Sequence, residues 1–421
     1  MSDKQRKICF VGLYNEKNLG DPIIFDCTEW LYGKCVESGD FVSQRLYLDY
    51  VQKTYRPSIM WKVRNRVARI FSPGRLYSLS FEKMIFKKTR EYFETYIKDF
   101  DLVVVVGGGI VKWTYQFFYA ELTALLNAAE SLNVPVVFNA VGVEGYSDSD
   151  FKCRMLKQAM QLPALIHVST RDDLETLAGK YYDGNPRRPL LRVSDPAVWV
   201  SEAYGIKKKE SRKIGVGVVR GGIFNDNAID FGPVELLTLY KDVIRTLAAD
   251  GCDVEVFTNG LPADNDFAEQ VCASLVEDGV SVCRRYPENT HELVDIISGY
   301  MAIVAARLHA CIIAYSLDVP AVGLVWNDKL PLFGRNILAE DNFIKHDDFS
   351  AAKIVGQLYK AAAAGYDQAV KSEFRQTIIE DIMEIDRKTI SMEMKEHILI
   401  GGGKIRPIHR LNNRHELRFC A

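Results

Sequence analysis

Residues 102–109 have the sequence LVVVVGGG, an apolar run that ends in three glycines. The run is short, β-branched and uncharged, which is typical of a parallel strand covered on both faces. Three glycines after such a strand permit a sharp turn and leave backbone N–H groups available to a ligand. We therefore predict a buried strand that leads into a functional loop.

Similar apolar runs lie on both sides of this stretch. In the first half, we predict buried strands at residues 7–12, 102–107, 134–139 and 165–169, with a helix at 121–132. Alternation of strand, helix and strand implies a parallel sheet with right-handed crossovers.

The same alternation restarts after a polar, lysine-rich connector at residues 201–212. The predicted strands of this half are 213–219, 253–258, 301–305 and 321–326. The predicted helices are 233–250, 264–278, 290–299 and 309–317. We predict an α/β protein of two Rossmann-like domains with mostly parallel sheets, a GT-B-like architecture with its active site in the interdomain cleft.

The predicted domains are residues 1–205 and 206–400, followed by a basic tail at 401–421 that we expect to be disordered. A helix at 373–395 is expected to cross back onto the first domain. A basic insertion occupies about residues 50–90, where eleven Lys or Arg accompany one acidic residue, Glu82. It is either an amphipathic helix on an anionic membrane surface or a solvated helix or groove wall facing an acidic acceptor.

Composition excludes several classes of protein. The formal net charge of −2 over 421 residues gives no reason to expect nucleic-acid binding. The nine cysteines are scattered without metal-ligand spacing, which suits a reducing cytoplasm. No signal peptide or membrane-spanning run is visible. We predict a cytoplasmic protein that is soluble or peripheral on the inner face of the plasma membrane.

Polar residues follow the first predicted strand. Asn18, Gly20 and Asp21 precede Pro22, so we expect Asp21 to be the N-cap of the next helix and Pro22 its first residue. The N–H groups at such a helix start can face an anion. An ordinary strand-to-helix turn is the alternative.

Two further loops follow strands of the same sheet. Gly107, Gly108 and Gly109 form neither a dinucleotide-binding GxGxxG nor a phosphate-binding GxxxxGK[ST] motif. Arg171 follows the strand at 165–169 and is predicted to point into the cleft, while Asp172 caps the next helix. The alternative for these two residues is a structural Arg–Asp pair.

Residues 305–335 contain the most informative cluster. Arg307 and His309 lie where a strand gives way to an apolar helix, and Lys329 follows the next strand. A guanidinium, an imidazole and an ammonium at neighbouring strand ends suit a ligand with phosphate and carboxylate groups. Arg220, after the strand at 213–219, is a further candidate. A lone His on an apolar helix is more often a core residue, but its neighbours favour function here.

These residues resemble the motifs of the polysaccharide pyruvyl transferase family. The resemblance rests on N-x-G-D at 18–21, GGG at 107–109, R-D at 171–172, D-P at 195–196, R-x-H at 307–309 and P-x-x-G with D-K between 320 and 329. Residues 15–17 depart from the family pattern. The resemblance implies a GT-B-like fold, phosphoenolpyruvate as donor, and no cofactor or metal. It also implies a sugar hydroxyl pair of a cell-surface polysaccharide, or of its free or lipid-linked precursor, as acceptor.

Formation of a pyruvate ketal assigns roles to these side chains. His309 is the candidate general acid or base, because histidine is the side chain that ordinarily changes protonation near neutrality. Arg307, Lys329, Arg171 and Arg220 are the candidates to hold phosphoenolpyruvate. The alternatives are a GT-B glycosyltransferase that uses a nucleotide sugar and a non-catalytic protein that binds anionic glycans.

Overall fold

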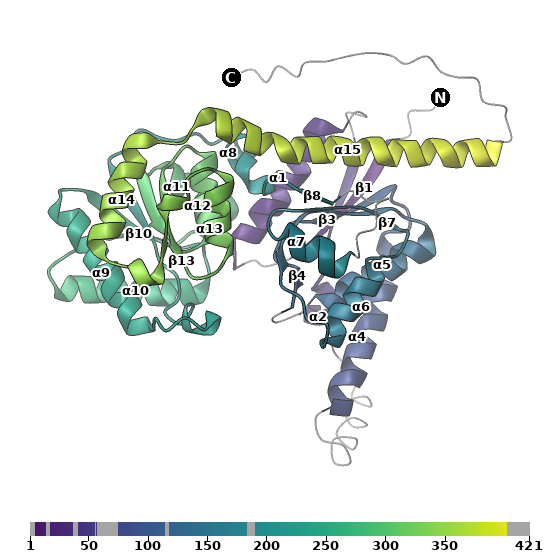
Figure 1. The fold of residues 1–421 in the computed structure, drawn as a ribbon, viewed down its shortest axis with the longest axis horizontal. Helices are drawn as coiled ribbons and strands as arrows, with labels where there is room; N and C mark the ends of the chain where they lie inside the picture. The colour runs from purple at the N-terminus through teal and green to yellow at the C-terminus, as the bar shows by residue number, and fades with distance from the viewer. Residues whose placement is uncertain are drawn as a thin grey trace.

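The computed structural model describes residues 5–13, 17–36, 41–54, 56, 75–113, 118–182 and 190–401. These residues form two α/β lobes, each built on a six-stranded sheet, and a long C-terminal helix that spans both (Figure 1). All strand pairs in both sheets are parallel. The predicted α/β class with mostly parallel sheets is therefore confirmed.

The first sheet has the strand order β2-β1-β3-β5-β7-β8. Its strands are β1 Arg6–Gly12, β2 Phe41–Tyr47, β3 Leu102–Val106, β5 Val136–Val141, β7 Leu165–Thr170 and β8 Leu190–Arg192. A small separate sheet pairs β4 Val111–Lys112 with β6 Val143–Glu144. The helices of this lobe are α1 Gly20–Cys35, α2 Tyr50–Thr54, α4 Arg75–Tyr96, α5 Tyr119–Leu132, α6 Phe151–Ala159, α7 Leu174–Thr176 and the π-helical turn η1 Leu177–Tyr181.

The second sheet has the order β11-β10-β9-β12-β13-β14. Its strands are β9 Lys213–Gly217, β10 Asp253–Phe257, β11 Cys283–Arg285, β12 Ala302–Ala305, β13 Ala321–Val325 and β14 Phe343–Lys345. Two short helices, η2 Pro196–Trp199 and α8 Val200–Tyr204, connect the lobes. The remaining α-helices are α9 Pro233–Ala249, α10 Pro262–Glu277, α11 Thr290–Ser298, α12 Leu308–Ser316, α13 Lys329–Asn336, α14 Ala351–Ala364 and α15 Gln368–Gly401, and three short 3-10 helices are η3 Asn225–Asn227, η4 Glu340–Asn342 and η5 His346–Asp348.

The strands predicted from the sequence are the four central strands of each sheet. The four strands without a sequence prediction, β2, β8, β11 and β14, are the edge strands. Buried and exposed side chains do not alternate regularly along β2, and most of them are exposed. β11 is exposed along its whole length. Edge strands are covered less completely than central ones, so they lack the continuous apolar run that marks a buried strand.

Two predicted helix starts are wrong by one or two residues. Helix α1 begins at Gly20, so Asp21 lies in its first turn instead of capping it, and Asp21 Oδ2 accepts a hydrogen bond from Asn18 Nδ2 at 3.1 Å. Helix α7 is capped by Asp173, which accepts from the Thr176 N–H at 2.9 Å, and not by Asp172. At α1 the N-cap position is Leu19, which makes no side-chain cap hydrogen bond. At α7, two neighbouring aspartates compete for the cap, and the contact of Asp172 with Val143 leaves the cap to Asp173.

The predictions at the two basic segments fall partly outside the described residues. In the basic insertion, residues 57–74 are not described, and the helix α4 follows them. In the predicted tail, residues 402–421 are not described. Among the described residues, no helix has the length and apolar character needed to cross a membrane.

Helix α15 leaves the second lobe and runs along the first, as the helix predicted at 373–395 was expected to do (Figure 1). A buried carboxylate on this helix, Asp381, anchors it to the first sheet. Its oxygens lie 2.8 Å from Asn139 Nδ2, 2.7 Å from His167 Nε2 and 2.5 Å from Ser169 Oγ. These three partners lie on β5 and β7, so one side chain of α15 contacts two neighbouring strands.

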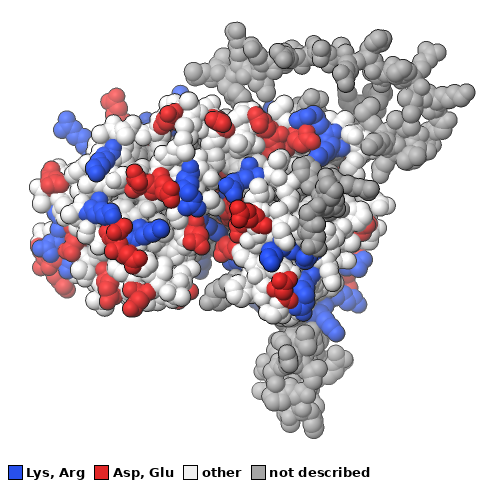
Figure 2. All heavy atoms as spheres, in the orientation of Figure 1, with Lys and Arg blue, Asp and Glu red and all other residues white. Residues whose placement is uncertain are grey.

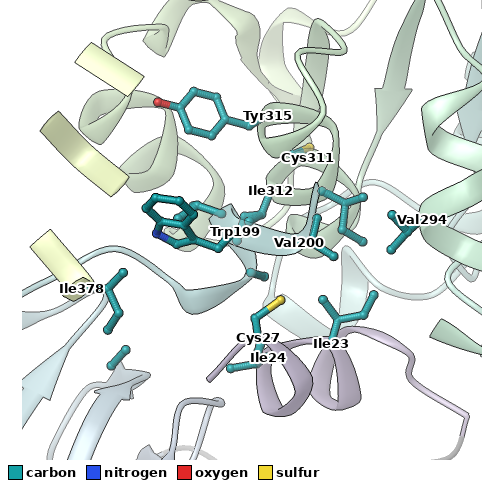
Figure 3. Close-up of a cluster of buried hydrophobic side chains, with 14 of the residues drawn as sticks. Ile23, Ile24, Cys27, Trp199, Val200, Val294, Cys311, Ile312, Tyr315 and Ile378 are labelled. Atoms are coloured by element: carbon teal, nitrogen blue, oxygen red, sulfur yellow. The ribbon is translucent and has the colours of Figure 1, made fainter. Parts of the chain in front are cut away.

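One apolar cluster continues from the first lobe into the second. Ile24 and Cys27 of α1, Val200 of α8, Ile312 of α12 and Ile378 of α15 all belong to it (Figure 3). We call this cluster, contributed by α1, η2, α8, α12 and α15, the interdomain core. Because apolar side chains in such a core are close-packed, it fixes how the two sheets face each other.

Replacing Asp381 by Ala should lower the free energy of unfolding by about 3–5 kcal/mol, because three buried polar groups lose their shared partner. Urea denaturation checks this value. Glu380→Ala, on the exposed face of the same helix, is the control and should change stability by less than about 0.5 kcal/mol. Equal losses in the two variants would contradict the anchoring role of Asp381.

Candidate active site

The residues singled out from the sequence lie at the carboxyl edges of the two sheets, where parallel sheets bind ligands. In the first lobe they are Asn18, Gly20 and Asp21 after β1, Gly107, Gly108 and Gly109 after β3, and Arg171 after β7. In the second lobe they are Arg220 after β9, Arg307 and His309 after β12, and Lys329 after β13.

The two edges meet where His309 lies against Gly20. His309 is in the first turn of α12, Gly20 is the first residue of α1, and 13% of the His309 side chain is exposed. A Cβ atom at residue 20 would lie 2.7 Å from Cγ of the His309 ring and closer still to Nδ1. Gly20 is therefore needed for space, because any side chain there would displace the imidazole.

Asp195 connects this imidazole to the first lobe. Its Oδ2 forms an ion pair with Arg171 and lies 3.8 Å from His309 Nε2, while its Oδ1 accepts from the Ala197 N–H at 2.9 Å. Burial alone would raise the pKa of Asp195, but Arg171 and then His309 hold it below its usual range. The carboxylate is thus charged, and Arg171 pairs with Asp195 instead of with its neighbour Asp172.

Lys329 bridges the lobes from the other side. As the first residue of α13, it forms an ion pair with Glu144 at the end of β6. Its Nζ would lie 3.1 Å from a Cβ at residue 109, so the last glycine of the GGG loop leaves room for the ammonium group. Burial lowers the pKa of Lys112 on β4, with Glu144 opposing and Lys329 adding to this shift.

Arg307 and Arg220 belong to a different cluster. Arg307 donates from Nε and Nη2 to the fully buried Asp264, at 2.9 and 2.7 Å. Asp264 also accepts from the Arg220 N–H at 3.0 Å, whereas the Arg220 guanidinium pairs with Asp226 at the surface. Arg307 is therefore held by a bidentate pair beside the site, and the Arg220 side chain does not join Arg307.

A cavity lies between the lobes beside His309. The four charged residues of its lining, Arg171, Asp172, Asp195 and Lys329, form what we call its polar wall. Its remaining lining comes from the second lobe and α15, namely Leu308, Ile312, Leu332, Phe333, Asn336 and Phe374. We call it the interdomain cavity. Figure 2 shows basic and acidic side chains side by side on the surface where the two lobes meet.

Sequence reasoning missed the carboxylates that pair with the cations at the two sheet edges. Glu144 and Asp264 were not singled out, and Asp195 was noted only as part of a motif. Each lies far along the chain from its partner, 43 residues in the case of Asp264 and Arg307. No local pattern connects such pairs. Within the described parts of the chain, no group of three or more His, Cys, Asp or Glu side chains is arranged to hold a metal ion.

Two parallel sheets joined by a crossing helix, with polar loops of both lobes around one cavity, define a protein of GT-B-like fold. Solved UDP-N-acetylglucosamine 2-epimerases share this fold. The protein from Rickettsia bellii aligns with a TM-score of 0.51 at 10% identity, over 94% of this chain and 98% of its own. The protein from Methanocaldococcus jannaschii aligns with a TM-score of 0.50 at 12% identity, over 84% and 92%. At such identities the likeness shows the fold alone.

A family model described as polysaccharide pyruvyl transferase matches residues 16–328, which is most of the chain. The chain therefore belongs to the polysaccharide pyruvyl transferase family. A search of curated protein sequences gives no match.

Replacing Gly20 by Ala should lower the free energy of unfolding by about 1–3 kcal/mol, because the added methyl overlaps the His309 ring. The double variant Gly20→Ala/His309→Ala should recover most of this loss in a double-mutant cycle measured by urea denaturation. Gly33→Ala on the same helix, where a Cβ meets nothing within 4 Å, is the control and should be neutral or stabilising. If the effects of the two changes on the free energy of unfolding were additive, residue 20 and the His309 ring would not be in contact.

Proposed function

We propose that this protein transfers the enolpyruvyl group of phosphoenolpyruvate to two hydroxyls of a sugar, forming a pyruvate ketal on a cell-surface polysaccharide or its precursor. One observation carries the proposal: in a member of this family, Arg171 and Lys329 come from different lobes and line the same cavity, beside His309.

The cations of the cavity suit a donor that carries phosphate and carboxylate groups. Arg171 uses Nη1 for Asp195, and its buried Nε has no hydrogen-bond partner among the described residues. Lys329 has Glu144 as its partner, a carboxylate whose side chain is 41% exposed. A guanidinium can hold a carboxylate or phosphate by two N–H groups, and an ammonium supplies a point charge. We assign donor binding to these two side chains. Arg307 and Arg220, which do not line the cavity, are further candidates.

The reaction requires a proton at the methylene carbon of phosphoenolpyruvate, attack by a hydroxyl at C2, loss of phosphate and attack by a second hydroxyl. Of the two hydroxyl protons, one balances the proton gained by the methylene carbon and the other leaves with phosphate. His309 is the candidate to move protons, because its Nε2 is buried without a hydrogen-bond partner among the described residues. The Asp195 carboxylate lies 3.8 Å from that nitrogen.

The acceptor and the location of the protein remain predictions. A lipid-linked acceptor would bring the protein to the inner face of the plasma membrane, and the basic insertion is the candidate contact surface. Its residues 57–74 lie outside the described part of the chain. No cofactor beyond the co-substrate phosphoenolpyruvate is part of the proposal.

Titration calorimetry with phosphoenolpyruvate, and in parallel with UDP-, GDP- and CDP-sugars, tests the donor. Phosphoenolpyruvate should bind, and Arg171→Ala and Lys329→Ala should each weaken binding about tenfold or more, because each removes a charge-assisted contact. Arg307→Ala should weaken binding less, because Arg307 is paired with Asp264 outside the cavity. Binding of a nucleotide sugar without phosphoenolpyruvate would replace this proposal with a glycosyltransferase.

His309→Ala should keep phosphoenolpyruvate binding and lower acceptor-dependent phosphate release about 100-fold or more, as expected when a general acid or base is lost. Phosphate release with a panel of nitrophenyl glycosides measures turnover. His346→Ala, a change in a partly exposed histidine on the surface, is the matched control and should retain turnover. Unimpaired turnover in the His309 variant would refute its role.

A further inference from the structure

Asp172 is a buried carboxyl group on the polar wall of the interdomain cavity, and its two oxygens differ in their contacts. The residue follows β7 and is 5% exposed. Its Oδ1 accepts from the N–H of Val143 at 2.6 Å and from the N–H of Asp173 at 2.9 Å. Its Oδ2 has no hydrogen-bond partner among the described residues. One oxygen therefore fixes the orientation of the group, and the other is buried without a hydrogen-bond partner in the described part of the chain.

The backbone beside Oδ2 is kept clear of side chains. A Cβ at residue 142 would lie 3.2 Å from Asp172 Oδ2 and 2.8 Å from the carbonyl oxygen of Gly108. Gly142 also donates its N–H to that same carbonyl at 2.7 Å. Oδ2 thus lies next to the point where the loop after β5 meets the GGG loop after β3, the loop from which the sequence predicted ligand contacts.

Charged groups from several elements surround Asp172. Arg171 precedes it, and Lys329 on α13 lines the same cavity together with Asp195. Lys329 is in turn paired with Glu144 on β6. Burial raises the pKa of Asp172, and Lys329 and Arg171 only partly offset that effect. The group therefore keeps its proton to a higher pH than an ordinary aspartate does.

Pyruvyl transfer needs two proton-transfer sites, one for the methylene carbon and one for the attacking hydroxyl. The unpartnered Nε2 of His309 can accept a proton from a hydroxyl, so His309 suits the hydroxyl. A carboxyl group whose pKa is raised by burial suits the methylene carbon, because protonating carbon requires a group that holds its proton more firmly than an ordinary aspartate does. His309 belongs to the second lobe and Asp172 to the first, so the two groups come from the two lobes that enclose the cavity.

We propose that Asp172 is the second acid–base residue of this site and protonates the methylene carbon of phosphoenolpyruvate from Oδ2, an assignment that rests on the proposed function. The C2–C3 π electrons take the Asp172 proton, the first hydroxyl bonds to C2, and His309 accepts the proton of that hydroxyl. The C2–O bond to phosphate then breaks, and phosphate leaves with the proton from His309. The second hydroxyl bonds to C2 and returns its proton to Asp172, which restores both residues.

Asp172→Asn tests this role because the amide oxygen can keep the Oδ1 hydrogen bonds while the acidic proton is lost. Acceptor-dependent phosphate release should fall about 100-fold or more, with the Kd for phosphoenolpyruvate changed less than about threefold. The wild-type rate should also decline as pH rises and Asp172 loses its proton. Asp173→Asn, which alters the neighbouring helix cap, is the control and should retain turnover within about threefold. Turnover of Asp172→Asn within threefold of wild type would overturn the proposal.

An infrared measurement without acceptor separates this proposal from the proposed function. Wild-type protein at neutral pH should show the C=O band of a protonated carboxyl group that Asp172→Asn lacks, with or without phosphoenolpyruvate. Absence of that band would overturn the role of Asp172 even if phosphoenolpyruvate binds. If the band is present but the protein binds no phosphoenolpyruvate, the proposed function has failed. The assignment of Asp172 to the methylene carbon of phosphoenolpyruvate then fails as well.

Discussion

The burial of one apolar cluster between α1 and α12 is the constraint on which the rest of the site depends. Each lobe has its own sheet, but the interdomain core gives the lobes one common interior through α8 and α15. This packing sets the carboxyl edges of the sheets against each other and places His309 on Gly20. Since the core is close-packed, the spacing of groups from the two lobes is built into the fold.

Charge neutralisation is the second principle of the site. Arg171, Lys329 and Arg307 each have a carboxylate partner, because a buried cation without one would carry a large desolvation penalty. The partners differ in exposure. Asp195 and Asp264 are buried, whereas 41% of the Glu144 side chain is exposed. The pair between Lys329 and Glu144 therefore costs least to open, and it is also a pair that joins the two lobes.

Central strands could be predicted from the sequence, and edge strands could not. The run at residues 102–106 is apolar at every position because both faces of β3 are covered. β11 has the sequence CRR and is exposed throughout, so it becomes a strand only by pairing with β10. The predictions of two helix starts were wrong for a related reason. Asp172 and Asp173 have equal capping chemistry, and the N–H of Val143, 29 residues away, binds the first of them.

By itself, the sequence determined which residues stand at the ends of the central strands, including Arg171, His309 and Lys329, because apolar runs and their boundaries are local properties. Only the tertiary structure decided which of these residues meet. It joined Arg171 to Asp195, and it paired Arg307 with Asp264 outside the cavity. Partner choice depends on the packing of segments distant in the chain, and a local pattern carries no information about that packing.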